Sequence, residues 1–129
     1  MRRVAAGEGI QLPVKYMGHL FEQYVGLELV RYANLTLKRV KIRYWRDANG
    51  PEVDWVIDAP GVLIPIEVKW ADHVNINDAK HLKSFLSEYD EAHCAYVICR
   101  IPFKQKLAEN IYALPWQDIS DLFSDFYSK

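Results

Sequence analysis

Residues 52–70 read EVDWVIDAPGVLIPIEVKW, and this stretch predicts a β-hairpin that carries charged residues inside its apolar runs. Both halves are rich in Val, Ile and Trp, which favour strands, and Pro60-Gly61 between them is typical of a turn. Asp54 interrupts the first half, and Glu67 and Lys69 interrupt the second. Because side chains alternate along a strand, pairing in the obvious register places these three on one side of the sheet.

The segments around the hairpin predict an α/β domain. Helical periodicity covers residues 15–33, and a period of two over residues 35–46 indicates a strand whose Arg39, Lys41 and Arg43 form a basic face. Asn77 is expected to cap a helix that ends near Tyr89. The remaining expectations are a turn at 47–51, a central strand at 93–100, a loop or partial helix at 101–110, a short strand at 111–115 and a closing helix at 116–128.

The expected order is therefore αβββαβ, followed by one further strand and helix. A helix between the third and fourth strands allows these two to run parallel, so the central sheet is expected to be mixed and flanked by helices. The length of 129 residues suits one domain, which we place at residues 15–129, after a linker or frayed N-terminus at 1–14.

Composition narrows the classes of function. The net charge of −1 argues against a protein that coats nucleic acid through bulk charge, although it leaves room for a local basic face. No apolar run could span a bilayer, and no secretory signal follows the basic N-terminus, so the expected location is the cytoplasm without membrane partners. No GxxxxGK[ST] motif is present, so this chain binds no nucleotide through a P-loop.

The grouped carboxylates predict a metal site. Two carboxylates held close together repel each other, and a divalent cation removes the conflict. Hard oxygen ligands suit Mg²⁺ or Mn²⁺, which bind through one or two carboxylates plus waters and substrate phosphate. Lys69 would project on the same side, where it could orient a water or balance charge on a phosphate. The alternative is a surface hairpin whose charges form ordinary ion pairs.

The pattern of Asp54 followed by Glu67-Val68-Lys69 resembles the PD-(D/E)XK nuclease superfamily, which has an αβββαβ core. More narrowly, the chain resembles the domain of unknown function found at the C-terminus of archaeal and bacterial AAA+ ATPases. The matching segments are Gly18–Val25 (GHLFEQYV), Arg46, Glu52–Val56 (EVDWV) and Ile66–Lys69 (IEVK). Val53 stands where the nominal motif has Pro, and the Asp is intact.

This resemblance implies roles for individual residues. Asp54, Glu67 and the main-chain carbonyl of Val68 would be metal ligands, and Lys69 would be the catalytic lysine. Glu22 would be an additional acid beside the metal, for which Gly18 and Gly26 leave room on the helix. The alternative for Glu22 is a solvent-facing helix residue. An ATPase domain would lie upstream of this sequence.

Two functions are therefore expected to compete. The first is a Mg²⁺- or Mn²⁺-dependent nuclease that hydrolyses phosphodiester bonds in DNA, or else RNA, with Arg39, Lys41, Arg43 and Arg46 binding phosphates. The second is a catalytically inactive module of the same fold that binds nucleic acid or protein within an ATPase. Dimerisation through apolar surface is a third option. Trp45, Trp55 and Trp70 could stack on bases, although aromatic residues beside a sheet more often belong to the core.

Overall fold

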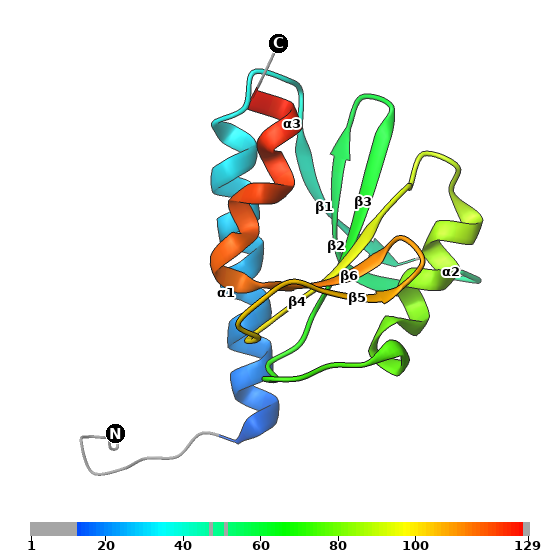
Figure 1. Ribbon diagram of the computed structural model, residues 1–129. Coiled ribbons are helices and arrows are strands. Elements are labelled where there is room, and N and C mark those ends of the chain that lie inside the picture. Colours follow the sequence, from blue (N-terminus) through cyan, green and yellow to red (C-terminus); the bar gives the residue numbers. More distant parts are fainter. Residues whose placement is uncertain (1–12, 47, 51, 128–129) are drawn as a thin grey trace.

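The computed structural model describes residues 13–46, 48–50 and 52–127 and has a mixed sheet of six strands with helices on both faces (Figure 1). The strand order is β1-β2-β3-β4-β6-β5. The elements in chain order are α1 (Val14–Asn34), β1 (Lys41–Arg46), β2 (Glu52–Ala59), β3 (Val62–Val68), the 3₁₀ turn η1 (Ile76–Ala79), α2 (Lys80–Glu88), β4 (Ala95–Cys99), β5 (Gln105–Ala108), β6 (Ile111–Pro115), the 3₁₀ segment η2 (Trp116–Phe123) and α3 (Ser124–Tyr127).

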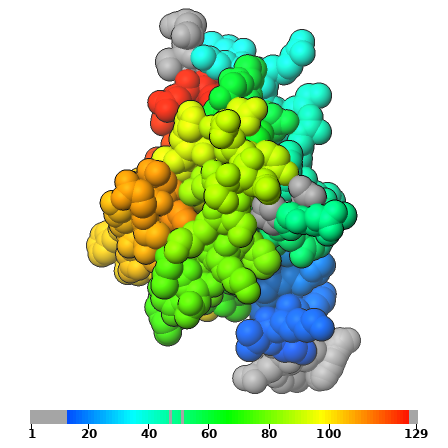
Figure 2. All heavy atoms as spheres, turned by 90° about the vertical axis from the view of Figure 1, so that its right-hand side faces the viewer, coloured from blue at the N-terminus to red at the C-terminus, as the bar shows by residue number. Residues whose placement is uncertain are grey.

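The helices form the outer layers of a three-layer α/β/α arrangement. Helix α1 and the C-terminal η2-α3 segment lie side by side on one face, and α2 covers the other (Figure 1). The first face buries Val25 and Leu29 of α1 against Ile57 and Ile66 of the sheet. The second buries Phe85 of α2 against Val97 of β4. The start of α1 projects beyond the rest of the domain (Figures 1 and 2).

The topology confirms the expected mixed α/β fold. Strands β1, β2 and β3 form an antiparallel meander, whereas β3, β4 and β6 run parallel to one another. The crossover from β3 to β4 carries α2, as a parallel connection requires. Strand β4 is central, between β3 and β6, which explains its continuous apolar sequence. None of the helices in the described ranges has the length and hydropathy that a membrane crossing needs.

Several boundaries differ from the sequence-based expectations. Strand β1 begins at Lys41, so residues 35–40 precede it. Residues 105–108, expected as loop or partial helix, form β5, which pairs antiparallel with β6 at the edge of the sheet. The helical segment begins with η1, and its cap is Asn75 rather than Asn77, because Asn75 accepts from the Asn77 backbone N–H in a capping box with Asp78. The closing helix is mostly 3₁₀.

The predicted ends fall partly outside the described residues. Of the expected linker at residues 1–14, residues 1–12 lie outside, and Val14 already begins α1. Of the predicted turn at 47–51, the structure describes residues 48–50. Residues 128–129, at the end of the predicted closing helix, also lie outside.

Candidate active site at a bulge between β1 and β2

A β-bulge in β2 determines where Asp54 lies. Arg43 pairs with Val56 and Trp45 pairs with Val53, so the single residue Tyr44 faces both Asp54 and Trp55. An extra residue of this kind bends the strand and redirects the side chains after it. Bulges are frequent beside active sites for that reason.

The bulge changes which residues of β2 share a face. Strict alternation would place Val53 and Val56 on opposite faces of the sheet, but both pack in the cluster beneath α2. In β1, which carries no extra residue, the expected alternation holds. Tyr44 is exposed and stacks on Trp55 with 5.2 Å between ring centroids. Trp45 lies on the other face, where it packs against Phe85 in the cluster beneath α2. A bulge changes the alternation by one residue, which a strict period of two cannot anticipate.

Asp54 and Glu67 meet where β2 and β3 separate. The ladder between these strands ends at the pair Trp55–Ile66, and Asp54 and Glu67 are the next residue on each strand. The Asp54 carboxylate accepts a hydrogen bond from the Val68 backbone N–H at 2.8 Å. The side chain of Asp54 therefore bridges the gap that opens between the two strands.

Glu67 is the buried member of this carboxyl pair. Its residue is 9% exposed, and it is the one charged residue buried within the described part of the chain. Burial raises the pKa of Glu67 to about 9, the charge of Asp54 and a hydrogen bond between the two carboxyls add to the rise, and the Lys69 ammonium opposes it. Glu67 thus favours its protonated form, because it is buried beside the Asp54 carboxylate and no cation separates the two groups.

Helix α1 brings Glu22 within electrostatic reach of the pair. The pKa of Glu22 is raised, first by partial burial and then by the charge of Asp54, while His19 and Arg46 counteract the rise. Glu22 also contributes to the raised pKa of Glu67. Glu22 is half-buried, and the charge of Asp54 acts on it. Its role as an additional acid stays a prediction.

Gly26 has a different role from the one expected. A Cβ at Gly26 would lie 2.3 Å from Cζ2 of Trp55, so the glycine admits the indole ring against the helix. A Cβ at Gly18 would meet only the Cβ of Trp70, at 4.0 Å. The space that Gly26 leaves on the helix is therefore filled by the ring of Trp55, one of the two bulge residues.

The donor set suits a cation held by few protein ligands. Within residues 13–46, 48–50 and 52–127, no three His, Cys, Asp or Glu side chains gather closely enough to form a complete ligand set. Mg²⁺ is commonly bound through one or two carboxylates, with waters and substrate phosphates completing the shell. Asp54 and Glu67 fit that description, and the Val68 carbonyl stays a predicted further ligand.

The four basic residues expected to bind phosphates do not form one cluster. Arg39, Lys41 and Arg43 line an open hollow of about 330 Å³ beside the β2–β3 turn. Arg43 is paired there with Asp58 at 2.6 Å. Arg46, at the other end of β1, pairs with Glu52 and lies close enough to Glu22 to influence its pKa.

Sequence reasoning missed a second feature, an apolar cavity beside α1. The sequence suggests Trp70 as a stacking residue but gives no role to Arg100 and Trp116, which also line the cavity. Their positions in the sequence could have indicated the cavity, because each of the three follows the end of a strand in the parallel part of the sheet.

Comparison with known families places the chain in one of them. Residues 17–119 match the family model described as a domain of unknown function, DUF4143, whereas the curated proteins give no match. The matched range begins within α1, ends within η2 and includes Glu22, Asp54, Glu67 and Lys69. Because the match covers most of the 129 residues, the chain belongs to the DUF4143 family of domains of unknown function.

Proposed function

We propose that this domain is a metal-dependent nuclease that hydrolyses phosphodiester bonds in DNA, or else RNA, as the C-terminal part of an ATPase. The observation that carries the proposal is the Asp54–Glu67 carboxyl pair, with Glu67 buried, at the point where β2 and β3 separate. Burying a carboxyl against another carboxyl costs free energy, and a site for a divalent cation gives that arrangement a use. The matching family is described only as a domain of unknown function, so the match itself gives no support for a particular activity.

The residues of the chain have distinct tasks in this proposal. Asp54 and Glu67 would hold Mg²⁺ or Mn²⁺, and such an ion supplies Lewis-acid stabilisation of the charge on the phosphate when bound. Hydrolysis forms one bond from water oxygen to phosphorus and breaks one ester bond, and the leaving oxygen takes up a proton. Lys69 would orient the attacking water or balance the negative charge that develops on the phosphate. Glu22 would assist as an additional acid.

Cleavage by a Lys69→Ala variant tests the proposal. We expect the wild-type protein to cut labelled DNA only with Mg²⁺ or Mn²⁺ present, and Lys69→Ala to retain its fold and metal binding without cutting. Lys83→Ala, which changes an exposed lysine on α2, is the matched control and should cut normally. Metal-dependent cleavage that persists in a clean preparation of Lys69→Ala would refute the role of Lys69.

A second candidate function, binding without catalysis, is favoured by two surface observations. Arg43 and Arg46 are engaged with Asp58 and Glu52, which reduces the charge available for phosphates. Helix α1 exposes apolar side chains, with Leu27 at 71% and Val14 at 76%. An inactive module would bind nucleic acid and fail to cut it under any metal condition, so the same assay separates the two candidates.

A further inference from the structure

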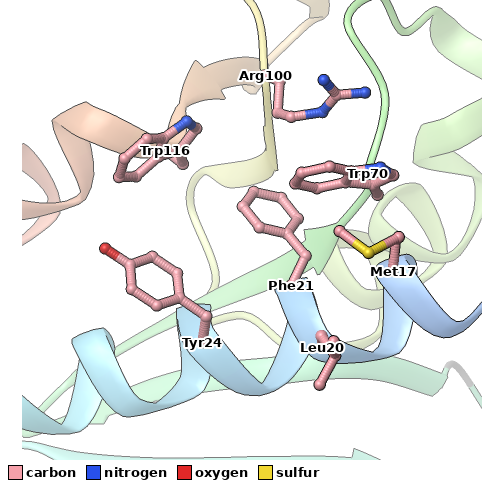
Figure 3. A pocket seen from close by; sticks show the side chains of 7 residues that line it. All are labelled: Met17, Leu20, Phe21, Tyr24, Trp70, Arg100 and Trp116. Atoms are coloured by element: carbon pink, nitrogen blue, oxygen red, sulfur yellow. The ribbon is translucent and has the colours of Figure 1, made fainter. Parts of the chain in front are cut away.

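An apolar cavity of about 430 Å³ lies beyond the carboxyl ends of the parallel strands (Figure 3). Strands β3, β4 and β6 end at Val68, Cys99 and Pro115, and the residues that follow them supply one wall. In open α/β sheets this edge is where ligands bind. The lining residues are Trp70, Arg100 and Trp116 from the strand ends, and Met17, Leu20, Phe21 and Tyr24 from α1.

Four aromatic rings shape the cavity. Phe21 and Trp70 meet edge to face with centroids 5.2 Å apart, and Tyr24 and Trp116 do so at 5.8 Å. Figure 3 shows the two pairs side by side above α1. An aromatic lining favours a ligand with a flat ring that can stack on it. The lining exposes almost no polar atoms, so it could not distinguish such rings by their hydrogen-bonding groups.

Arg100 gives this cavity a positive charge at its rim. Its guanidinium carbon lies 3.9 Å from the centroid of a Trp70 ring, on the side away from α1 (Figure 3). A guanidinium carries five N–H donors in one plane, an arrangement that suits the oxygens of a phosphate. A phosphate beside a stacked ring would therefore meet a suitable donor, which favours a nucleotide over an uncharged aromatic ligand.

The cavity is continuous in sequence with the candidate active site. Trp70 follows Lys69 directly, and Phe21 precedes Glu22. The segment just after β3 therefore carries one residue of each site, Lys69 and Trp70, and α1 carries another such pair, Phe21 and Glu22. The two sites are therefore one residue apart along the backbone at both places, although neighbouring residues of an extended strand point to opposite sides.

We propose that the cavity binds an unpaired nucleobase of the nucleic-acid strand by stacking, while Arg100 contacts the adjacent phosphate. This inference rests on the proposed function and specifies its substrate. A base inside a duplex is already stacked between its neighbours and cannot enter, so the domain would prefer single strands, flaps or frayed ends over blunt duplex. Because every base offers a π face, binding would show little sequence preference.

Binding of a dT oligonucleotide that carries one 2-aminopurine tests the cavity directly, in buffer with EDTA so that nothing is cut. Stacking quenches the fluorescence of the modified base. Trp116→Leu and Tyr24→Leu keep apolar bulk but remove a flat ring, and we expect each to weaken binding about fivefold or more. Trp116→Phe should restore much of the loss. Phe103→Leu, at an exposed aromatic residue that does not line the cavity, should bind like the wild type.

Two further measurements identify the contacts. Arg100→Gln should lower the affinity and reduce the salt dependence by about one phosphate contact. A 5-iodouracil oligonucleotide should cross-link to peptides that contain Tyr24, Trp70 or Trp116. Cavity variants that bind as well as the wild type, or cross-links that map only elsewhere, would overturn the inference.

The outcomes separate this inference from the proposed function. If the cavity variants bind normally while metal-dependent cleavage persists, the cavity assignment fails and the nuclease stands. If the oligonucleotide binds through the cavity but is never cut, the nuclease fails and the cavity stands. If the wild type binds no oligonucleotide and also cuts no DNA with Mg²⁺ or Mn²⁺ present, both fail, and an apolar side chain of a protein partner becomes the better occupant.

Discussion

The indole Nε1 of Trp55 donates a hydrogen bond to the backbone carbonyl of Glu22 at 3.2 Å, and this bond ties the β2 bulge to helix α1. Residues Trp55 and Asp54 are the two that the bulge sets opposite Tyr44. The bond therefore fixes the height of α1 above the sheet at the turn that carries Glu22. The position of the Glu22 carboxylate relative to Asp54 depends on this contact.

Gly26→Ala is expected to destabilise the domain because its new Cβ would overlap the Trp55 ring, 2.3 Å from Cζ2. Overpacking of this kind costs about 1–3 kcal/mol. Gly18→Ala is the matched control on the same helix, where the added Cβ meets nothing closer than 4.0 Å and helix propensity should add up to about 1 kcal/mol. Urea unfolding measures both, and a Gly26→Ala variant as stable as Gly18→Ala would contradict the proposed packing.

Asp54→Asn should keep the fold but lose affinity for Mn²⁺. The Asn side-chain oxygen can still accept from the Val68 N–H, whereas the negative charge is gone. Removal of a residue that merely hydrogen-bonds to a metal ligand typically lowers metal affinity about 10–100-fold. Removal of the charge of a ligand itself should therefore lower the affinity for Mn²⁺ by at least about tenfold. Calorimetry checks this, with Asp58→Asn as control on the same strand. Equal binding by wild type and Asp54→Asn would remove Asp54 from the metal site.

Glu67→Gln should make the metal-free domain more stable at alkaline pH. The folded state holds the Glu67 proton up to a pKa of about 9, whereas the unfolded state releases it near 4.5. Between these values the folded state binds more protons, so the free energy of unfolding falls as pH rises. Gln carries no such proton and escapes this loss. With about 1.4 kcal/mol for each of the roughly 3.5 pH units between 4.5 and 8, we expect a gain of up to about 5 kcal/mol near pH 8.

Thermal or urea unfolding in EDTA from about pH 4 to 9 checks this prediction. The advantage of Glu67→Gln should shrink toward zero at the acidic end, where both states hold the proton. Glu88→Gln, at an exposed position on α2, should leave the pH profile unchanged. A Glu67→Gln profile parallel to that of the wild type would show that Glu67 is not the group responsible.

Arg39→Gln combined with Lys41→Gln should reduce the salt dependence of DNA binding. Both residues line the hollow beside the β2–β3 turn. Each lost phosphate contact should lower the slope of log K against log salt by about 0.7–0.9. Fluorescence anisotropy over a salt series measures the slope, and Lys80→Gln with Lys83→Gln on α2 removes the same charge elsewhere. Equal slopes for both double variants would exclude a specific role for the hollow.

Local patterns predicted most of the fold because they reflect burial. The periodicity of α1, the apolar run of β4 and the turn at Pro60-Gly61 each report a physical constraint that acts within a few residues. Strand β5 escaped because it lies at an edge, where exposed residues such as Lys106 need no apolar alternation. Its pairing with β6 comes from the tertiary fold.

The candidate site was predictable in its residues but not in its geometry. Asp54, Glu67 and Lys69 stood out as charges within apolar runs, and their register predicted that they would meet. The bulge at Asp54 and Trp55 depends on how β1 and β2 fit around Tyr44, and no single residue announces it. The same holds for the cavity, since Arg100 and Trp116 come together only through the parallel order of β4 and β6.

The hydrogen bonds just beyond β3 have a consequence for the motions of Lys69. Its backbone N–H donates to Ile98 at 2.9 Å, and the Arg100 N–H returns a bond to Ala71 at 2.9 Å. The main chain at the lysine is thus part of the same cooperative unit as β4, four of whose five residues are buried. The backbone amide hydrogen of Lys69 should therefore exchange with solvent only when the central sheet opens. The Lys69 ammonium then changes position only by rotation of its side chain, because the backbone that carries it is held in place.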